Sequence, residues 1–283
     1  MPELPEVETI RQGIIQNLKG KKIQNIDIRA PKLFIGNKKD IIGAKIIDAK
    51  RVAKILEIVL SNDYSILIHL KLTGQLVYQP KDKNVECAVG GHMQKAYGQK
   101  LPHLHTHIIY TFSDGSKLFF NDLRKFGWNR VIKSNEVKNI LGPDKFGPEP
   151  GSQEFTLEYL ARIFSKSGKR IKEVLMDQAK ISGLGNIYAN DALYWAGILP
   201  ARPAKSLSNV ETSKLKNAIE KVINLGLKYG GSSENTYVNI EGKRGHYMEV
   251  AAVYQKNKDP KSHPIKKIKI GGRGSFYCPI CQK

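Results

Sequence analysis

The period of the hydrophobic pattern changes once along this 283-residue chain, and that change limits the folds open to it. From about residue 23 to 133, short apolar segments alternate with turn signals, as is typical of β-strands. After residue 154, apolar residues recur at helical spacing. A segment rich in proline and glycine, 134–153, separates the two parts. Because a chain of this length has room for two hydrophobic cores, we expect an α+β protein with a β-rich N-terminal part and a helical C-terminal part.

In the N-terminal part we expect one helix followed by many short strands. The helix covers residues 5–19, where an apolar stripe ends at Gly20. The sequence Ser-Asp-Gly-Ser at 113–116 predicts a hairpin turn, because Asp-Gly readily takes the positive φ angles of a tight turn. So many short strands at regular spacing favour a sandwich or barrel. The predicted strands are 23–28, 54–60, 64–72, 106–112 and 117–123.

The C-terminal part is expected to hold helices and a small β appendage. Its last helix has Ser208 as a cap and stops at Gly230-Gly231. The long irregular insertion at 81–102 has no readable role. The predicted helices are 155–164, 170–178, 186–198 and 208–230, followed by a strand at 250–254 and a terminal hairpin around 271–274.

The charge balance favours a polyanionic partner. Lysine and arginine total 46 against 26 acidic residues, a formal net charge of +20. There is no apolar run long enough to span a bilayer and no signal-peptide pattern, and the three cysteines (Cys87, Cys278 and Cys281) are too few for a secreted disulfide framework. These observations predict a cytoplasmic protein that binds nucleic acid.

The N-terminus has the chemistry of a nucleophile. Removal of Met1 would expose the secondary amine of Pro2, which condenses with an aldehyde to a cationic iminium. Glu3 would then lie beside that centre, and Glu6 would share its helical face. Proline and acidic residues also suit an ordinary helix start, and these residues by themselves favour that interpretation.

Five segments in register resemble the formamidopyrimidine-DNA glycosylase family (Fpg), which is related to the Nei enzymes. They are PELPEVE (2–8), RVAKIL (51–56), FNDLRKFGW (120–128), SGLGNIYANDALYWAGI (182–198) and GGRGSFYCPICQK (271–283). The resemblance implies a bifunctional DNA glycosylase and abasic-site lyase of base excision repair. Such an enzyme removes 8-oxoguanine and formamidopyrimidines from duplex DNA through a Schiff base of its N-terminal proline and β,δ-elimination. The stretch 230–254 resembles the Fpg loop that closes over an oxidised purine.

By this resemblance the catalytic residues are Pro2 as nucleophile, Glu3 as proton donor and Lys54 as a phosphate contact that takes part in proton transfer. Arg273 would assist the second elimination by gripping a phosphate with its guanidinium fork. Glu6 would position or tune the site. Without the alignment, Lys54 would be taken for a solvated charge at a strand edge.

The resemblance also implies a wedge that fills the space left by a flipped base. Arg124 would hydrogen-bond the orphaned partner base, and Phe126 would restack its neighbour. Leu72 stands where the family has a methionine, and its similar volume should preserve the wedge.

Further DNA contacts are expected at a helix–two-turn–helix motif. The glycines of Ser-Gly-Leu-Gly-Asn at 182–186 would let phosphate approach the next helix N-terminus, with Asn186 adding a side-chain contact. Basic residues nearby, Lys169 and Lys172 among them, would extend the phosphate track or simply be exposed charges. His105 matches a family histidine that meets the DNA backbone. The turn lacks the strand–GxGxxG–helix context of a dinucleotide site, so no nucleotide cofactor is expected.

The C-terminal finger departs from the family, whose four cysteines hold zinc. Only Cys278 and Cys281 remain, with His263 as a candidate third ligand. We therefore expect a zincless hairpin held by packing, with a partial or inter-chain metal site as the less favoured alternative. Depending on the direction of counting, the positions of the first pair hold Lys258 and Lys261, or Lys261 and Pro264.

Together these features predict four segments: a catalytic β-sandwich with flanking helices (1–133), a linker (134–153), a helical DNA-binding domain with the lesion-recognition loop (154–247) and a finger-like hairpin (248–283). The expected partner is damaged double-stranded DNA, bound by a monomer at the nucleoid, with no membrane and no required cofactor. Two alternatives remain: a Nei-like enzyme for oxidised pyrimidines, and a DNA-lesion-binding protein that has lost catalysis because its loosened finger misplaces Arg273.

Overall fold

The computed structural model describes residues 1–81, 91–92, 101–232, 237–238 and 245–283. These residues form two compact units. The first comprises Met1–Gly142 and Gly230–His246, and the second comprises Pro143–Tyr229 and Tyr247–Lys283. The described residues of the segment after α6 therefore belong to the same unit as the N-terminal residues, whereas the sequence assigned them to the helical domain. The C-terminal hairpin, which the sequence predicted as a separate finger-like segment, belongs to the second unit.

The strands described in the first unit form two sheets. One sheet has the order β1-β8-β9-β6-β7-β11 and the other β2-β10-β5-β4-β3, and neighbours are antiparallel except for β2 and β10. Short 3₁₀ turns lie at Pro31–Leu33, Lys38–Asp40 and Ser134–Glu136, and the short helix α2 is Val137–Leu141. The strands are β1 Ile23–Ile28, β2 Phe34–Ile35, β3 Ile46–Val52, β4 Ile55–Leu60, β5 Tyr64–His69, β6 Gly74–Gln79, β7 Gly91–His92, β8 Thr106–Phe112, β9 Lys117–Asp122, β10 Trp128–Lys133 and β11 Tyr237–Val238.

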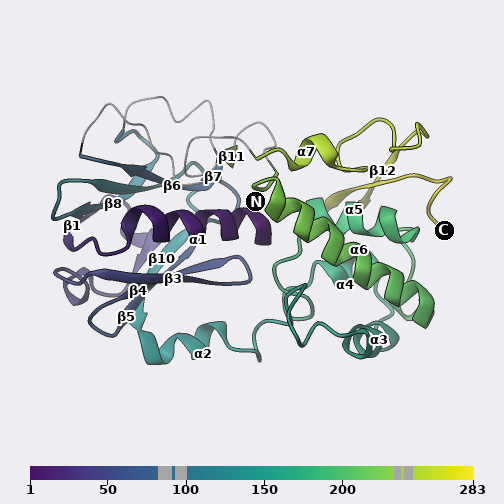
Figure 1. Ribbon diagram of the computed structural model, residues 1–283, viewed down its shortest axis with the longest axis horizontal. Coiled ribbons are helices and arrows are strands. Elements are labelled where there is room, and N and C mark those ends of the chain that lie inside the picture. The colour runs from purple at the N-terminus through teal and green to yellow at the C-terminus, as the bar shows by residue number, and fades with distance from the viewer. Residues whose placement is uncertain (82–90, 93–100, 233–236, 239–244) are drawn as a thin grey trace. The chain divides into compact units, whose positions relative to one another are not determined.

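Helix α1 (Leu4–Leu18) covers the core of this sandwich. Its apolar stripe, which includes Ile10 and Ile14, packs into one cluster with side chains from both sheets, such as Leu56 and Phe120. In Figure 1, α1 runs beside β3. The predicted sandwich and N-terminal helix are confirmed, and the predicted turn at 113–116 joins β8 to β9 with Gly115 at φ 85°.

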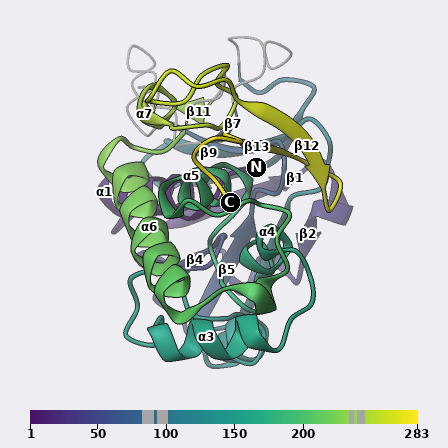
Figure 2. The ribbon, with the colours of Figure 1, turned by 90° about the vertical axis from the view of Figure 1, so that its right-hand side faces the viewer.

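The second unit is mainly helical. Its helices are α3 Leu157–Ser165, α4 Ile171–Leu175, α5 Asn186–Ala196, α6 Asn209–Lys228 and α7 Tyr247–Val250, with a 3₁₀ turn at Ala204–Ser206. Helix α6 packs against α5, as Figure 2 shows. Ser208 caps α6 in a capping box with Glu211, which confirms the predicted start. The predicted terminal hairpin is also present, as β12 Lys266–Ile270 and β13 Arg273–Tyr277.

The predicted strand at 250–254 is wrong. Its backbone curls around the carboxylate of Asp191, a fully buried residue of α5. The N–H groups of Ala252, Val253 and Tyr254 all donate to that carboxylate, at 3.0, 3.0 and 3.1 Å. Three successive N–H groups that converge on one side chain cannot alternate outward as a strand ladder requires.

The linker predicted at 134–153 is divided between the two units. The predicted linker contains α2, and from Pro143 onward it belongs to the second unit, where Gly147 N donates to Gln178 O at 2.9 Å. Most of the insertion at 81–102, including Cys87, lies outside the described residues. Among the described residues, no helix has both the length and the apolar character that a bilayer crossing requires.

Candidate active site

Two acidic side chains are buried beside Pro2 at the N-terminus of α1. Pro2 is buried, and Glu3 and Glu6 expose only 3% and 2% of their surface. Glu3 is the N-cap residue, and its N–H donates to Glu6 Oε2 at 2.7 Å. The other oxygen of Glu6, Oε1, accepts from Ser232 N at 2.7 Å and from Ser232 Oγ at 3.0 Å. Glu6 thus ties the helix start to the segment that follows α6, which supports a positioning role.

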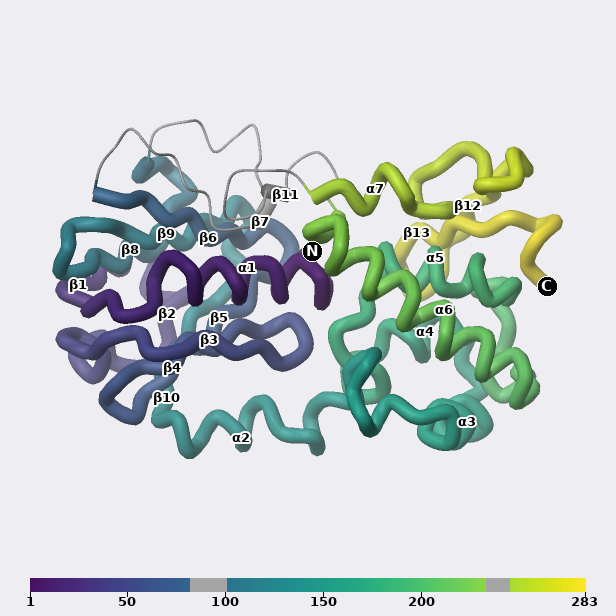
Figure 3. Tube along the Cα trace, viewed as in Figure 1, coloured from purple at the N-terminus to yellow at the C-terminus, as the bar shows by residue number. Residues whose placement is uncertain are grey.

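Lys54 lies in the two-residue turn between β3 and β4 and is only 5% exposed. The interpretation of Lys54 as a solvated edge charge is wrong, because the side chain is buried. A lysine is rarely buried unless its charge has a partner. The turn places the preceding residue, Ala53, at φ 53°. In Figure 3, the hairpin of β3 and β4 runs beside α1.

An ion pair connects this turn to α1. Glu8 Oε2 lies 3.2 Å from Arg51 Nε, and Arg51 Nη1 donates to Ala53 O at 3.0 Å. Arg11 also binds Glu8, at 2.7 Å from Oε1. Burial acts to raise the pKa of Glu8, but the two arginines outweigh it, so the pKa is lowered and the carboxylate stays ionised.

His69, at the end of β5, supplies a neutral ring near Lys54. Its Nδ1 accepts from Lys71 N at 2.9 Å, and the ring centroid lies 5.8 Å from that of Trp128. Burial, with the positive charges of Lys71 and Lys54, lowers the pKa of His69 to about 3. The ring is therefore uncharged at neutral pH and adds no further positive charge beside Lys54.

The loop between β9 and β10 presents Arg124 and Phe126 to solvent. Phe126 is 52% exposed, and the Arg124 guanidinium lies 4.9 Å from its ring centroid. The fully buried Asp122 shapes this loop, because its carboxylate accepts from Arg124 N at 3.1 Å and from Gly127 N at 2.6 Å. An exposed cation beside an exposed aromatic ring is the pair that the sequence predicted for a wedge.

Asp122 also brings the other predicted contacts of this unit to the same place. The hydroxyl of Thr73, the residue after the half-buried Leu72, donates to the Asp122 carboxylate and accepts from Arg124 N at 3.1 Å. The backbone N–H of Asp122 donates to the carbonyl of the half-buried His105 at 2.9 Å. Sequence reasoning missed Asp122, although it lies inside the motif FNDLRKFGW.

In the second unit, Arg273 is exposed at the start of β13, after Gly271 and Gly272 at φ 54° and 75°. The hairpin is anchored by Lys172, which is fully buried and lies in α4. Its Nζ donates to Gly274 O at 2.9 Å and to Ser275 Oγ at 2.7 Å. Lys172 is therefore neither part of an exposed phosphate track nor a solvated charge. It was missed as an anchor because nothing in the sequence distinguishes it from the other lysines.

The same unit holds the other two predicted DNA contacts. Asn186 is the first residue of α5, and Lys169 is exposed in the loop before α4. Asn190 holds these elements to the hairpin, since its Oδ1 accepts from Lys172 Nζ at 3.2 Å and from Phe276 N at 2.8 Å. The N-terminus of α5 and the Arg273 strand thus share a buried polar network.

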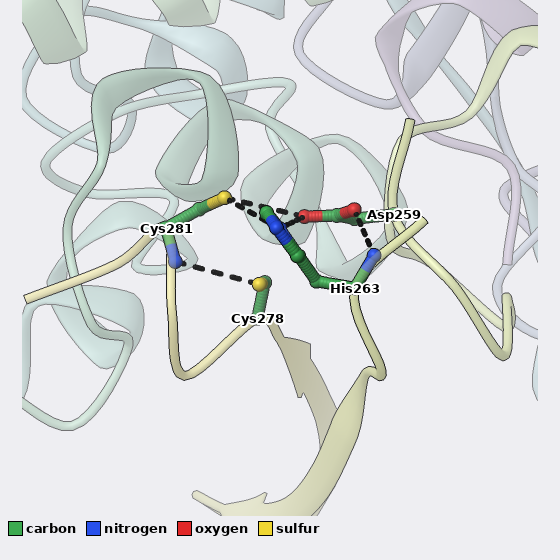
Figure 4. Close-up of side chains that lie close together, drawn as sticks. All are labelled: Asp259, His263, Cys278 and Cys281. Atoms are coloured by element: carbon green, nitrogen blue, oxygen red, sulfur yellow. Dashed lines mark hydrogen bonds and ion pairs between the residues drawn. The ribbon is translucent and has the colours of Figure 1, made fainter. Parts of the chain in front are cut away.

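The two cysteines that follow β13 lie close to other potential metal ligands. Cys278 and Cys281 lie with His263 and with Asp259, which the sequence analysis missed, in a group that could hold a metal ion. Figure 4 shows the four side chains turned toward one another. The structure thus adds a fourth potential ligand, Asp259, to the three residues that the sequence indicated.

Comparison with known families matches two segments of the chain. Residues 1–129 match the formamidopyrimidine-DNA glycosylase N-terminal domain, and residues 146–238 match the formamidopyrimidine-DNA glycosylase H2TH domain. The predicted helix–two-turn–helix motif lies within the second match.

Relatives match over the whole chain. Formamidopyrimidine-DNA glycosylases of Shouchella clausii and Desulforamulus reducens are 37% and 36% identical to it, with 100% of this chain and 99% of each relative covered. Among solved structures, a complex of Lactococcus lactis Fpg with DNA containing an abasic site superposes with a TM-score of 0.87 at 29% identity, covering 99% of both chains. A complex of the G226P mutant of that protein with Fapy-dG DNA gives 0.88 at 30% identity, covering 100% of both.

Proposed function

This chain belongs to the formamidopyrimidine-DNA glycosylase family, and from that premise we propose that it excises oxidised purines from duplex DNA and then cleaves the strand. The substrates are 8-oxoguanine and formamidopyrimidine lesions. The protein works as a monomer on chromosomal DNA in the cytoplasm, and the basic composition supports a DNA partner.

The burial of ionisable side chains in the unit that contains Pro2 is the observation that carries this proposal. Glu3, Glu6 and Lys54 are each at most 5% exposed, and all belong to the unit that contains Pro2. Burying ionisable groups costs free energy, so two buried carboxylates beside Pro2 and a buried lysine in the same unit fit catalysis better than a simple helix cap.

In the proposed first stage, the Pro2 nitrogen attacks C1′ of the damaged nucleotide. The C1′–N bond breaks, and the base leaves with the bonding electrons and takes up the proton that the Pro2 nitrogen loses. Glu3 delivers a proton to the ring oxygen, so that the sugar opens and a cationic iminium forms between Pro2 and C1′. Glu6 keeps its positioning role, since both of its oxygens already accept hydrogen bonds.

In the second stage, the iminium withdraws electrons and makes the C2′ proton acidic. Loss of that proton expels the 3′ phosphate by β-elimination, with Lys54 contacting phosphate and assisting proton transfer. A second elimination releases the 5′ phosphate, and Arg273 neutralises that leaving group with its guanidinium. The product is a one-nucleotide gap.

The remaining predicted residues hold the DNA. Arg124 and Phe126, with Leu72, fill the space left by the extruded nucleotide, while Asn186, Lys169 and His105 contact the backbone. The Asp122 hydrogen bonds support this assignment, because they connect the loops that carry Leu72, His105 and the Arg124–Phe126 pair.

Borohydride trapping on a duplex with 8-oxoguanine opposite cytosine tests the proposal. The mature chain should form a covalent adduct that maps to its N-terminal peptide, and Pro2→Gly should not. A chain that retains Met1, verified by intact mass, is the matched control, because its Pro2 nitrogen is an amide and cannot attack.

The same assay separates the alternatives. An adduct only on a duplex with an oxidised pyrimidine would replace the purine assignment with a Nei-like one. Retained lesion binding with no adduct on purine, pyrimidine or abasic duplexes would mean that the protein binds DNA without catalysis.

A further inference from the structure

Helix α6 presents a polar stripe to solvent. Five of its residues recur at alternating spacings of three and four, which places them on one face of the helix. All five are exposed, whereas residues such as Leu215 and Val222 on the other side of the helix are buried. This α6 stripe consists of Lys214, Asn217, Lys221, Asn224 and Lys228.

The α6 stripe faces away from the hairpin that carries Arg273. The buried face of α6 packs against α5, and α5 also packs against β13 of that hairpin. Figure 2 shows α6 on one side of α5 and the hairpin on the other. A ligand bound along the stripe would therefore occupy a surface that the proposed DNA contact of Arg273 does not use.

The positive charge of the stripe is not neutralised within the described part of the chain. Helix α6 has two acidic residues, and both are paired elsewhere. Glu211 Oε1 lies 2.5 Å from Arg202 Nη1, and Glu220 Oε1 lies 2.6 Å from the ammonium group of Lys216. None of the ion pairs between described residues includes a lysine of the stripe. The stripe therefore offers three cations to an external anion.

The three lysines form a nearly straight row. An interval of seven residues corresponds to about 10.5 Å along a helix and to a drift of about 20° around it, so the row from Lys214 to Lys228 is about 21 Å long. Duplex DNA rises about 3.4 Å per base pair, so the row matches the length of about six base pairs. One duplex can therefore meet all three ammonium groups.

An exposed aromatic ring lies beside the middle of the row. Lys221 Nζ is 3.7 Å from the ring centroid of Trp195, a residue of α5 that is 42% exposed. This cation–π contact holds the ammonium group at the stripe, so less side-chain entropy is lost when the lysine binds an anion.

The composition of the stripe favours nucleic acid over other polyanions. Lysine is depleted in protein–protein interfaces, whereas protein–DNA interfaces are polar and strongly positive. Lysine and asparagine side chains both donate hydrogen bonds to phosphate oxygens. A basic helix that binds a membrane buries its apolar face in lipid, but the apolar face of α6 is already buried against α5.

We propose that the α6 stripe binds the phosphate backbone of a second DNA duplex while a first duplex is held at the lesion site. The contact is independent of base sequence, because it involves phosphates only. One protein molecule thereby connects two DNA segments. The inference requires DNA as a partner but does not depend on the excision chemistry proposed above.

Energy transfer between two labelled duplexes tests the inference on the full chain. A short duplex with a tetrahydrofuran abasic analogue carries the donor and is bound first, and an undamaged duplex with the acceptor is then titrated in. Wild type should bring the two labels together. In Lys214→Gln/Lys221→Gln/Lys228→Gln the second duplex should bind at least about ten-fold more weakly, because three phosphate contacts are lost. Affinity for the first duplex should change by less than about two-fold.

The matched control removes the same charge from the first unit. Lys39→Gln/Lys45→Gln/Lys117→Gln changes three exposed lysines outside the stripe and should keep the second duplex. Equal losses in both triple variants, or no energy transfer with wild type, would overturn the proposal. Binding of polyglutamate but not of undamaged duplex would assign the stripe to an acidic protein instead. A chain that binds undamaged duplex through the stripe but does not bind the abasic analogue would contradict the proposed function and support this inference.

A second measurement does not depend on the triple variant. The chain has two tryptophans, so Trp128→Phe leaves Trp195 as the only one. Undamaged duplex added to the complex with the abasic analogue should change the Trp195 emission with the same midpoint as the energy transfer. Emission that stays constant at saturating duplex would mean that the second duplex binds elsewhere.

Discussion

At the scale of single residues, His69 is a ring whose charge the fold suppresses. Burial and the nearby Lys71 and Lys54 lower its pKa from 6.5 to about 3. The folded state therefore binds this proton less readily than the unfolded state. The stability that neutral His69 provides is complete above pH 6.5 and is lost progressively as the pH falls toward 3.

We predict that His69→Asn makes stability less sensitive to mild acid. The asparagine oxygen can replace Nδ1 as acceptor for Lys71 N, while the titrating group is gone. Between pH 6.5 and 4.5, wild type should lose free energy of unfolding at up to about 1.4 kcal/mol per pH unit more than the variant does. Urea unfolding at pH 7, 6 and 5 measures this slope.

That pH window separates His69 from the acidic groups whose pKa values are lowered. The lowered pKa of Asp114, held by Lys21 and Ser116 against the effect of burial, affects stability only below its ordinary value of 3.8. His103 and His107 also have lowered pKa values, with burial as the main cause, and they remain in the variant. Identical slopes for wild type and His69→Asn would contradict the assignment.

At the scale of elements, one carboxylate organises two loops that are expected to meet DNA. Asp122 uses both oxygens, Oδ2 for Gly127 N and Oδ1 for Arg124 N and the Thr73 hydroxyl. An isosteric asparagine keeps one acceptor oxygen but turns an NH₂ group toward a donor, whichever way the amide lies.

We predict that Asp122→Asn destabilises the first unit by about 1–3 kcal/mol and loosens the Arg124–Phe126 loop. Lesion-duplex affinity should fall, and the fluorescence of a 2-aminopurine placed beside the lesion should report less base extrusion. The matched control is Asp114→Asn at an exposed turn, where one oxygen can still accept from Ser116 N. Equal behaviour of the two variants would exclude the organising role of Asp122.

Element positions were predictable wherever the signal lies within a few neighbouring residues. The cap pair Ser208 and Glu211 begins α6, and the paired glycines Gly271 and Gly272 turn the last hairpin. The segment 250–254 was mistaken for a strand, because its apolar composition says nothing of Asp191, a carboxylate some sixty residues earlier.

The same distinction between local and distant signals holds for the candidate site. Pro2, Glu3 and Lys54 were predictable from motifs, but the partner of Glu6 is Ser232, 226 residues away in sequence. Asp259 could not be predicted as a potential ligand, because the family's ligands are cysteines and an aspartate next to a lysine carries no such signal. Contacts between distant segments arise only when the chain folds.

At the scale of the whole molecule, the net charge is +20. The basic side chains that produce it fall into two classes, because some are paired or buried and others are exposed. Some basic side chains are already neutralised, such as Lys216, which pairs with Glu220 at 2.6 Å on α6. Lys172 is buried within the second unit. Others, including Arg124 and Lys169, are exposed and belong to the predicted DNA-binding set.

We predict that the salt dependence of DNA binding distinguishes these classes of cation. Each phosphate contact releases counterions from DNA, so its loss should reduce the slope of log K against log salt by about 0.9. Lys169→Ala should therefore reduce the slope by about one unit, whether or not the duplex carries a lesion. Lys216→Gln removes the same formal charge but no phosphate contact, so it should leave the slope unchanged. Fluorescence anisotropy titrations over a range of salt concentrations give the slopes, and equal reductions in both variants would mean that net charge, rather than particular contacts, governs binding.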